Sequence, residues 1–121
     1  MTYNTAIRNA LATAYGDLFA SGTIEIRTVG GAALLCTISL PVSPFSAPAT
    51  GVISKSGTWA NTASGSGVAR VARFISSDTL KVADVTITEG GGGGELIIDN
   101  EDIVSGGTVT VTAYTYTVPA T

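Results

Sequence analysis

The stretch TIEIRTVGGAALLCTISL, residues 23–40, decides the fold class of this chain. In its first part Ile24 and Ile26 alternate with charged side chains, which is the period-two pattern of a strand buried on one face. A Gly-Gly pair, which can adopt the positive φ values of a hairpin turn, then leads into residues 32–40. That segment is apolar at consecutive positions, as a central strand is. The stretch therefore predicts two antiparallel strands.

Strand patterns continue along the rest of the chain. Residues 68–76 and 80–88 predict a second hairpin, and TVTVTAYTYTV, residues 108–118, predicts a long strand. Shorter strands are predicted at residues 52–55, 57–60 and 96–98. About eight strands with frequent turn signals, after one helix, are typical of an antiparallel β-sandwich or a jelly roll. A barrel with a helical plug is the alternative.

The long alternating strand at residues 108–118 is expected to have two apolar faces. Strict alternation places its apolar side chains on opposite faces of the strand: Val109, Val111 and Ala113 on one face, and Tyr114, Tyr116 and Val118 on the other.

The N-terminal segment, residues 1–22, has the period of an amphipathic helix instead. Thr2 or Asn4 can cap its start, and Gly22 can end it. We expect its apolar face to dock on the protein's own sheet or on a neighbouring molecule. That predicted face consists of Ile7, Ala10, Leu11, Ala14, Tyr15 and Leu18.

The segment PVSPFSAPATG, residues 41–51, cannot be a central strand because its prolines cannot donate to a strand ladder. It is predicted to be an extended loop or arm, with Phe45 as its large apolar side chain. Phe45 and Trp59, the only tryptophan, are each either core residues or anchors for a partner.

Composition limits the class of protein. At 121 residues the chain is long enough for one domain, residues 1–121, in which the β part covers residues 23–121. Only 12% of residues are charged, and a surface of short uncharged side chains suits packing against other proteins, although a secreted or periplasmic monomer has similar composition. The net charge of −3 and the lack of a basic patch argue against nucleic acid, and no apolar run is long enough to span a membrane.

Three further features are candidates for chemical sites. With no histidine and a single cysteine, Cys36, the chain cannot form a Cys/His metal site or a His-based triad. Five glycines, residues 90–94, lie next to carboxylates and lack a lysine, so a flexible loop between two strands is favoured over a phosphate site or a domain linker. The acidic run Asp99, Glu101 and Asp102 is interpreted as a solvated turn, with weak calcium binding as the alternative. Glycoside hydrolysis is not favoured, because no aromatic-rich cleft is evident to hold a sugar. No enzyme, cofactor or metal is therefore predicted.

Four segments, RNALATAYGDLF, LLCTISLPVSPF, VARVARFISSD and ELIIDNEDIVSGGTVTVTAYTYTVP, resemble a group of small virion structural proteins of tailed bacteriophages. The resemblance extends in order along nearly the whole chain. In that group an R-N-A-L-A helix precedes a G-x-hydrophobic-x-I strand, and an E-L-x-x-D-N-x-x-I-x-x-G-G-x-V strand ends in T-x-P. The five-glycine run and the Pro-rich residues 41–48 depart from the pattern. The group is similar to head decoration, or cement, proteins.

The resemblance implies a non-enzymatic β domain on the capsid exterior, made in the host cytoplasm. It implies binding to the major capsid protein and to other copies of the chain, as a trimer or dimer. The alternative is a tail-tube, head-completion or fibre-tip protein, in which Trp59, Tyr114 and Tyr116 could bind a glycan. Candidate regions of contact with the capsid or with neighbouring copies are the helix and loops 41–51 and 57–67. The candidate contact residues are Phe45, Val52, Ile53, Trp59, Ile7 and Leu11, of which Val52 and Ile53 directly follow the first loop.

Overall fold

The computed structural model describes residues 3–78, 82–89 and 96–118, with the backbone alone at Val82 and Ala83. Within these residues the protein is mainly β with one N-terminal helix, as predicted. The predicted loop at residues 90–94 lies outside them. The elements are α1 (Thr5–Leu18), β1 (Thr23–Arg27), the short 3-10 helix η1 (Val29–Gly31), β2 (Leu34–Ser39), β3 (Val52–Ser54), β4 (Ala60–Thr62), β5 (Gly67–Val68), β6 (Val71–Ile75), β7 (Val82–Glu89), β8 (Leu96–Ile98), β9 (Asp102–Ile103) and β10 (Thr108–Thr117).

Most strands belong to one curled, sandwich-like sheet with the order β2-β1-β6-β7-β8-β10-β3. Both predicted hairpins are confirmed, because β1 pairs antiparallel with β2 and β6 with β7. The prediction of an entirely antiparallel sheet is wrong at one place: β7 and β8 run parallel, with Ile87 opposite Leu96. The sequence pattern marks the strands but not their directions. Parallel neighbours are usually joined by a long, often helical, crossover, and residues 90–95 have no such signal, so the sequence suggested an antiparallel pair.

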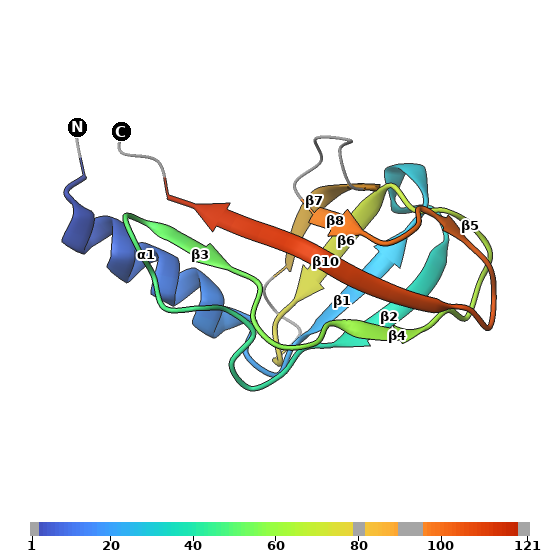
Figure 1. The fold of residues 1–121 in the computed structure, drawn as a ribbon, viewed down its shortest axis with the longest axis horizontal. Helices are drawn as coiled ribbons and strands as arrows, with labels where there is room; N and C mark the ends of the chain where they lie inside the picture. The colour runs from blue at the N-terminus through green and yellow to red at the C-terminus, as the bar shows by residue number, and fades with distance from the viewer. Residues whose placement is uncertain (1–2, 79–81, 90–95, 119–121) are drawn as a thin grey trace.

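The sheet curls until its two ends approach each other. Strand β4 pairs with β10 at Thr108–Thr110, and the side chain of Asn61 in β4 donates a hydrogen bond to the carbonyl of Thr37 in β2 at 2.8 Å. This curl, formed by the crossing strands on the right of Figure 1, encloses the main core. We call this part of the molecule, comprising β1, β2 and β4–β9 with the first half of β10, the body.

The largest side chains of the body are buried at its centre. Trp59 and Phe74 have no exposed surface, and their rings meet edge to face with centroids 6.1 Å apart. The indole N–H of Trp59 donates a hydrogen bond to the carbonyl of Ser56 at 3.1 Å. The polar atom of this buried ring is thereby satisfied, so the ring can contribute its full apolar area to the core.

A bulge in β10 overturns the predicted separation of its two apolar faces. The pairing of β10 with β8 shifts register between Val111 and Ala113, so one extra residue interrupts the alternation. Val111 before the bulge and Tyr114 after it are both buried, whereas Ala113 is exposed. Strict alternation is therefore wrong here, because the bulge returns the second apolar set to the interior.

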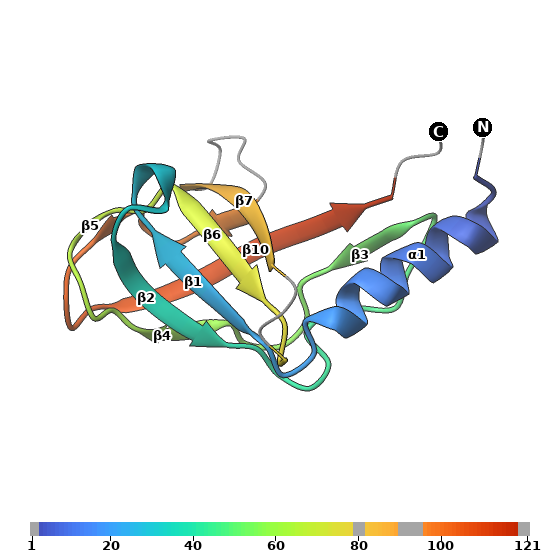
Figure 2. The ribbon, with the colours of Figure 1, turned by 180° about the vertical axis from the view of Figure 1, so that it is seen from behind.

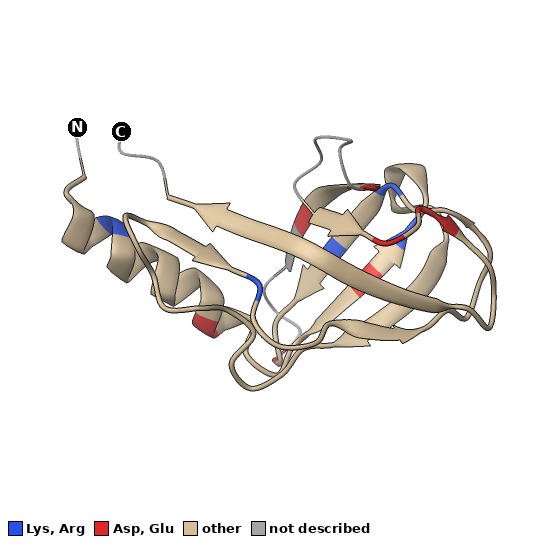
Figure 3. Cartoon of the chain, in the orientation of Figure 1, with Lys and Arg blue, Asp and Glu red and all other residues tan. Residues whose placement is uncertain are grey.

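The second half of β10 extends beyond the body and carries a projection that we call the arm. The arm consists of α1, β3 and Thr115–Thr117 of β10, and Figures 1 and 2 show it from opposite sides. Asn4 caps α1 by accepting a hydrogen bond from the backbone N–H of Ile7 at 2.9 Å. Most charged side chains lie on the body, whereas the arm carries few (Figure 3).

Candidate interaction surfaces

Helix α1 docks through its small residues and through Tyr15, the one large side chain of the predicted apolar face that packs against the rest of the chain. Ala12 and Gly16 are buried, and a Cβ atom added to Gly16 would lie 3.1 Å from Cδ2 of Phe45. These small residues allow the helix to lie close to Phe45 and Ile53, so they form the contact between α1 and the rest of the arm. The large aliphatic side chains of the predicted face are exposed to solvent instead: Ile7 is 47% exposed, Leu11 44% and Leu18 41%. We call these three residues the apolar stripe.

One column of α1 residues contacts the end of β10. The ring of Tyr15 stacks on that of Tyr116 with centroids 3.7 Å apart, and its hydroxyl is hydrogen-bonded to that of Tyr114 at 2.7 Å. Almost two turns before it, Nε of Arg8 donates to the carbonyl of Val118 at 3.0 Å. The Arg8 charge is thus turned toward β10 and away from the apolar stripe.

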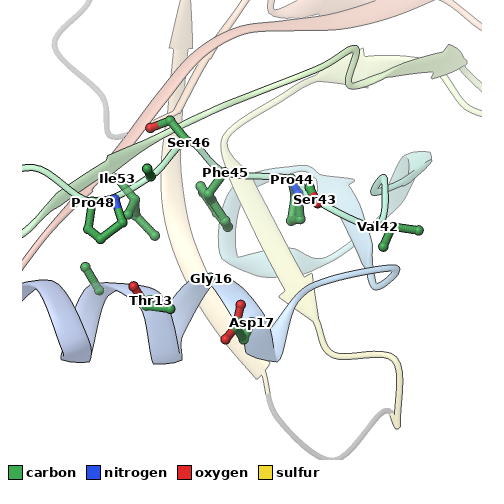
Figure 4. Close-up of a pocket in the computed structure, with 12 residues that line it drawn as sticks. Thr13, Gly16, Asp17, Val42, Ser43, Pro44, Phe45, Ser46, Pro48 and Ile53 are labelled. Carbon is green, nitrogen blue, oxygen red and sulfur yellow. The ribbon is translucent and has the colours of Figure 1, made fainter.

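The opposite flank of α1 faces the Pro-rich segment. Asn9 accepts a hydrogen bond from the N–H of Gly51 at 2.7 Å, and a hollow of about 190 Å³ opens between the helix and residues 42–48. Figure 4 shows Thr13 and Asp17 on one side of this hollow and Pro44 and Phe45 on the other. Its volume is below the roughly 300–1,000 Å³ of typical small-molecule sites. The hollow therefore does not favour a ligand site.

The predicted contact residues separate into three groups. Ile7 and Leu11 are exposed, and Phe45 and Val52 are half-buried. Ile53 and Trp59 are buried in the protein's own core, so their prediction as contact residues is wrong for this structure. The surrounding loops looked open in sequence, but the rest of the chain covers both side chains.

The aromatic residues that could have held a glycan are also covered. Tyr114 and Trp59 are buried, and Tyr116 is stacked on Tyr15. A carbohydrate platform needs an aromatic face open to solvent, which neither Trp59 nor Tyr114 provides. Tyr116 is half-buried, with one face covered by Tyr15.

A second exposed apolar group lies at the far end of the body. Val29 in η1 is 75% exposed, and Val104 between β9 and β10 is 68% exposed. Leu34 at the start of β2 and Val68 in β5 are partly exposed at the same end, opposite the arm (Figure 1). We call these four residues the distal group. No sequence signal predicted it, because isolated valines beside turns have no periodic pattern.

The acidic residues serve the fold in this structure. One carboxylate oxygen of Asp99 accepts hydrogen bonds from the N–H groups of Asn100 and Thr110, at 3.0 and 3.2 Å. Glu101 forms an ion pair with Arg70 at 3.1 Å. Among the described residues no cluster of three or more Asp, Glu, Cys or His side chains is placed to hold a metal. These contacts match the predicted acidic turn.

Cys36 is buried, as predicted, and burial raises the pKa of its thiol. Its Sγ atom lies 3.6 Å from the carbonyl of Thr62, to which it can donate weakly. A raised thiol pKa lowers the fraction of reactive thiolate. The geometry therefore favours a packing role for this residue.

The part of the chain that the structure describes contains no helix with the length and apolar character to span a bilayer.

Comparisons with models of protein families, with curated proteins and with solved structures found no match for this chain.

Proposed function

We propose that this protein is a non-enzymatic structural protein of a tailed-phage virion: a decoration, or cement, protein that binds the major capsid protein on the capsid exterior and stabilises the shell. The observation that carries the proposal is the exposure of large apolar side chains at two opposite ends of an elongated molecule. The apolar stripe lies at one end and the distal group at the other. The ordered sequence segments that resemble virion proteins support the same assignment.

Two separated apolar surfaces suit a protein that joins two partners. Burying each surface against a neighbour would release about 25 cal/mol per Å² of apolar area. The low charge of the chain, with 12% charged residues, keeps the cost of desolvating ions small. A cement protein needs both properties, since it contacts the shell and often its own neighbours.

The stabilising effect would follow from mass action. A domain that binds the expanded shell but not its dissociated subunits stabilises the shell by its free energy of binding. Each copy adds its own contribution over the capsid surface. Modest affinity per copy is therefore sufficient for a large effect on the particle.

The distal group is our candidate for contact with the shell. The half-buried Phe45 and Val52 lie beside α1 at the other end and are candidates for a separate contact, with the capsid or with a neighbouring copy. Val29 and Val104 are the most exposed members of the distal group. Several short loops meet at that end, where η1, β5 and the turn before β10 lie together (Figure 1). Such loops can follow the contour of a neighbouring subunit without disturbing the sheet.

The test is cosedimentation of purified protein with empty, expanded capsids of the phage that encodes it, assembled without it. We expect saturable binding in proportion to the capsid subunits, and survival of the loaded capsids at higher temperature. Val29→Asp should weaken binding. Ser39→Asp should not, because it adds the same charge at the end of β2 that lies away from η1 and the distal group. Absence of binding would refute the proposal, and binding of only a few copies per particle would favour the portal, the tail or the vertices instead.

A further inference from the structure

One edge of β10 is open within the arm. Strand β8 pairs with β10 only as far as Tyr114, and β3 pairs with Thr115–Thr117 along the other edge. Among residues 3–78, 82–89 and 96–118, no strand pairs with the β8-side edge of Thr115–Thr117. Within the described residues, three residues of extended backbone therefore have no partner strand at this edge.

The direction of the backbone groups follows from the bonds on the paired edge. Lys55 N–H donates to the Tyr114 carbonyl at 2.8 Å, and Val118 N–H donates to the Gly51 carbonyl at 2.9 Å. Because backbone groups of a strand alternate between its edges, the N–H and C=O groups of Thr115 and Thr117 face the open edge. Thr115 and Thr117 are themselves exposed.

Nothing in β10 protects this edge from pairing. Proteins commonly shield edge strands with lysine, proline or a bulge. From Thr108 to Thr117 the strand contains no charged residue and no proline, and its bulge lies before Tyr114. Threonine and tyrosine, which make up the open segment, favour extended pairing.

The apolar stripe lies on the same flank of the arm as the open edge. Tyr15 stacks on Tyr116 of β10, and the column that contains Asn9 and Gly16 contacts Gly51 and Phe45. Arg8 lies between the two, since it bonds the Val118 carbonyl and also lies against Gly51. At 100° per residue, Leu11 and Leu18 lie beside the Tyr15 column and away from the Asn9 column. A molecule that added a strand to β10 would therefore also meet the stripe.

We propose that this surface, the open edge of Thr115–Thr117 with the stripe of Ile7, Leu11 and Leu18, binds the same surface of a second copy across a twofold axis. The edge is self-complementary, because two antiparallel copies each offer the N–H and C=O groups that the other needs. If Thr115 of each copy pairs with Thr117 of the other, the free backbone groups of all four threonines are bonded. The two Tyr116 residues then lie opposite each other beside the axis. The result is a continuous sheet in the order β3-β10-β10-β3.

The helices complete this arrangement on one face of the joined sheet. Since Tyr15 stacks on Tyr116, the axis passes close to Tyr15 and to the small, exposed Ala14. Leu11 of one copy then lies opposite Leu18 of the other. The strand edge is completed and the exposed leucines are covered by one and the same contact.

Charge favours a second copy over a charged partner. The only charged residues of α1 are Arg8 and Asp17, of which Arg8 is bonded to Val118 and Asp17 borders the hollow on the opposite flank. A twofold contact brings each group near its own counterpart, so like charges would oppose it. No such repulsion arises on this surface, because its side chains are uncharged.

Sedimentation velocity on the purified protein, over a range of concentrations, tests the proposal. We expect a monomer–dimer equilibrium whose dissociation constant rises by roughly tenfold or more in Leu11→Glu and in Thr117→Pro. Proline removes an N–H that faces the open edge, so the monomer loses no internal hydrogen bond. Two matched controls should dimerise as the wild type does. Thr117→Val keeps the N–H, and Ala6→Glu places the charge on the flank of Thr13 and Asp17.

Circular dichroism of each variant verifies that it is folded, and hydrogen exchange should show protection of the Thr115 and Thr117 amides that increases with protein concentration. A wild-type protein that stays monomeric at its highest soluble concentration, forms a trimer, or dimerises equally well with either disruptive variant would overturn the proposal. The measurement needs no capsid. A dimer that fails to bind capsids would therefore count against the proposed function alone.

Discussion

The body and the arm solve the problem of burying apolar surface in different ways. In the body the curled sheet encloses Trp59, Phe74 and most other large apolar side chains within one chain. In the arm a single helix covers one face of two strands, with a small cluster of Ala12, Ile53 and Val118 between them. The body can complete its own core, whereas the arm leaves the three large aliphatic side chains of its helix exposed.

The difference implies that the arm depends on the body for its stability. A helix of 14 residues and a two-stranded ribbon are each marginal alone. The arm is anchored through aromatic contacts that lead into the main core. Phe19, just after α1, meets Phe74 edge to face at 5.6 Å, and Phe45 meets Trp59 at 5.4 Å. Loss of the body core should therefore release the arm as well.

The largest expected effect is that of Trp59→Ala, which breaks the body. Truncating this buried ring should lower the free energy of unfolding by about 3–5 kcal/mol, through lost burial and the cavity that remains. Urea denaturation followed by far-UV circular dichroism measures the loss, and α1 should unfold in the same transition as the sheet. Trp59→Phe, which keeps much of the ring, should cost less. A helix signal that survives after the sheet has unfolded would show that the arm is independent of the body.

The sequence predicted the body better than the arm, for a physical reason. The two hairpins of the body follow from period-two patterns, because each strand has one buried side and local turns join the partners. In the arm, the helix period was correct, but of the large side chains on the predicted face only Tyr15 packs against the rest of the chain. Hydrophobicity favours Ile7 and Leu11 for the contact, whereas close approach to Phe45 selects Ala12 and Gly16.

The bulge in β10 and the interaction surfaces depend on tertiary contacts that a single strand pattern does not contain. Reversal of the alternation at Ala113 is visible only through pairing with β8. Burial of Trp59 and exposure of Val29 likewise depend on segments distant in the sequence. Ile7 and Leu11 stay predicted contact residues; their helical period marks them as apolar, and the structure leaves both exposed.

A smaller effect is expected from Gly16→Val, which tests the close docking of the arm. The added side chain would meet Phe45 and Ile53, whose nearest atoms lie 3.1 and 3.3 Å from the position that a Cβ atom at Gly16 would take. We expect a loss of about 1–3 kcal/mol in the free energy of unfolding, with faster hydrogen exchange in α1 than in β1 and β6. Ala10→Val is the matched control, because Ala10 is exposed and should cost only about 0.5 kcal/mol in helix propensity. Equal losses in the two variants would contradict close packing at Gly16.

The smallest effect concerns charge, which also separates the two regions. The ion pairs of the described residues, Arg27 with Glu25, Arg70 with Glu101 and Arg73 with Asp84, all lie on the body. The hydrogen bond from Arg73 lowers the pKa of Asp84 below its ordinary value of 3.8. Because the folded-state pKa is lowered, the pair stabilises the fold above pH 3.8, and this contribution is lost as the pH falls through the folded-state value.

The pair is largely exposed, so its contribution should be small and reduced by salt. The difference in the free energy of unfolding between wild type and Asp84→Asn should shrink as the pH is lowered from neutral to below 3.8. In an Arg73→Met background, Asp84→Asn should lose this pH dependence, because the cation that lowers the pKa is gone. Hydrogen exchange in acid should therefore increase first in β6 and β7, which carry this ion pair. An increase that appeared first in α1 would contradict the view that ion pairs give the body its own response to acid.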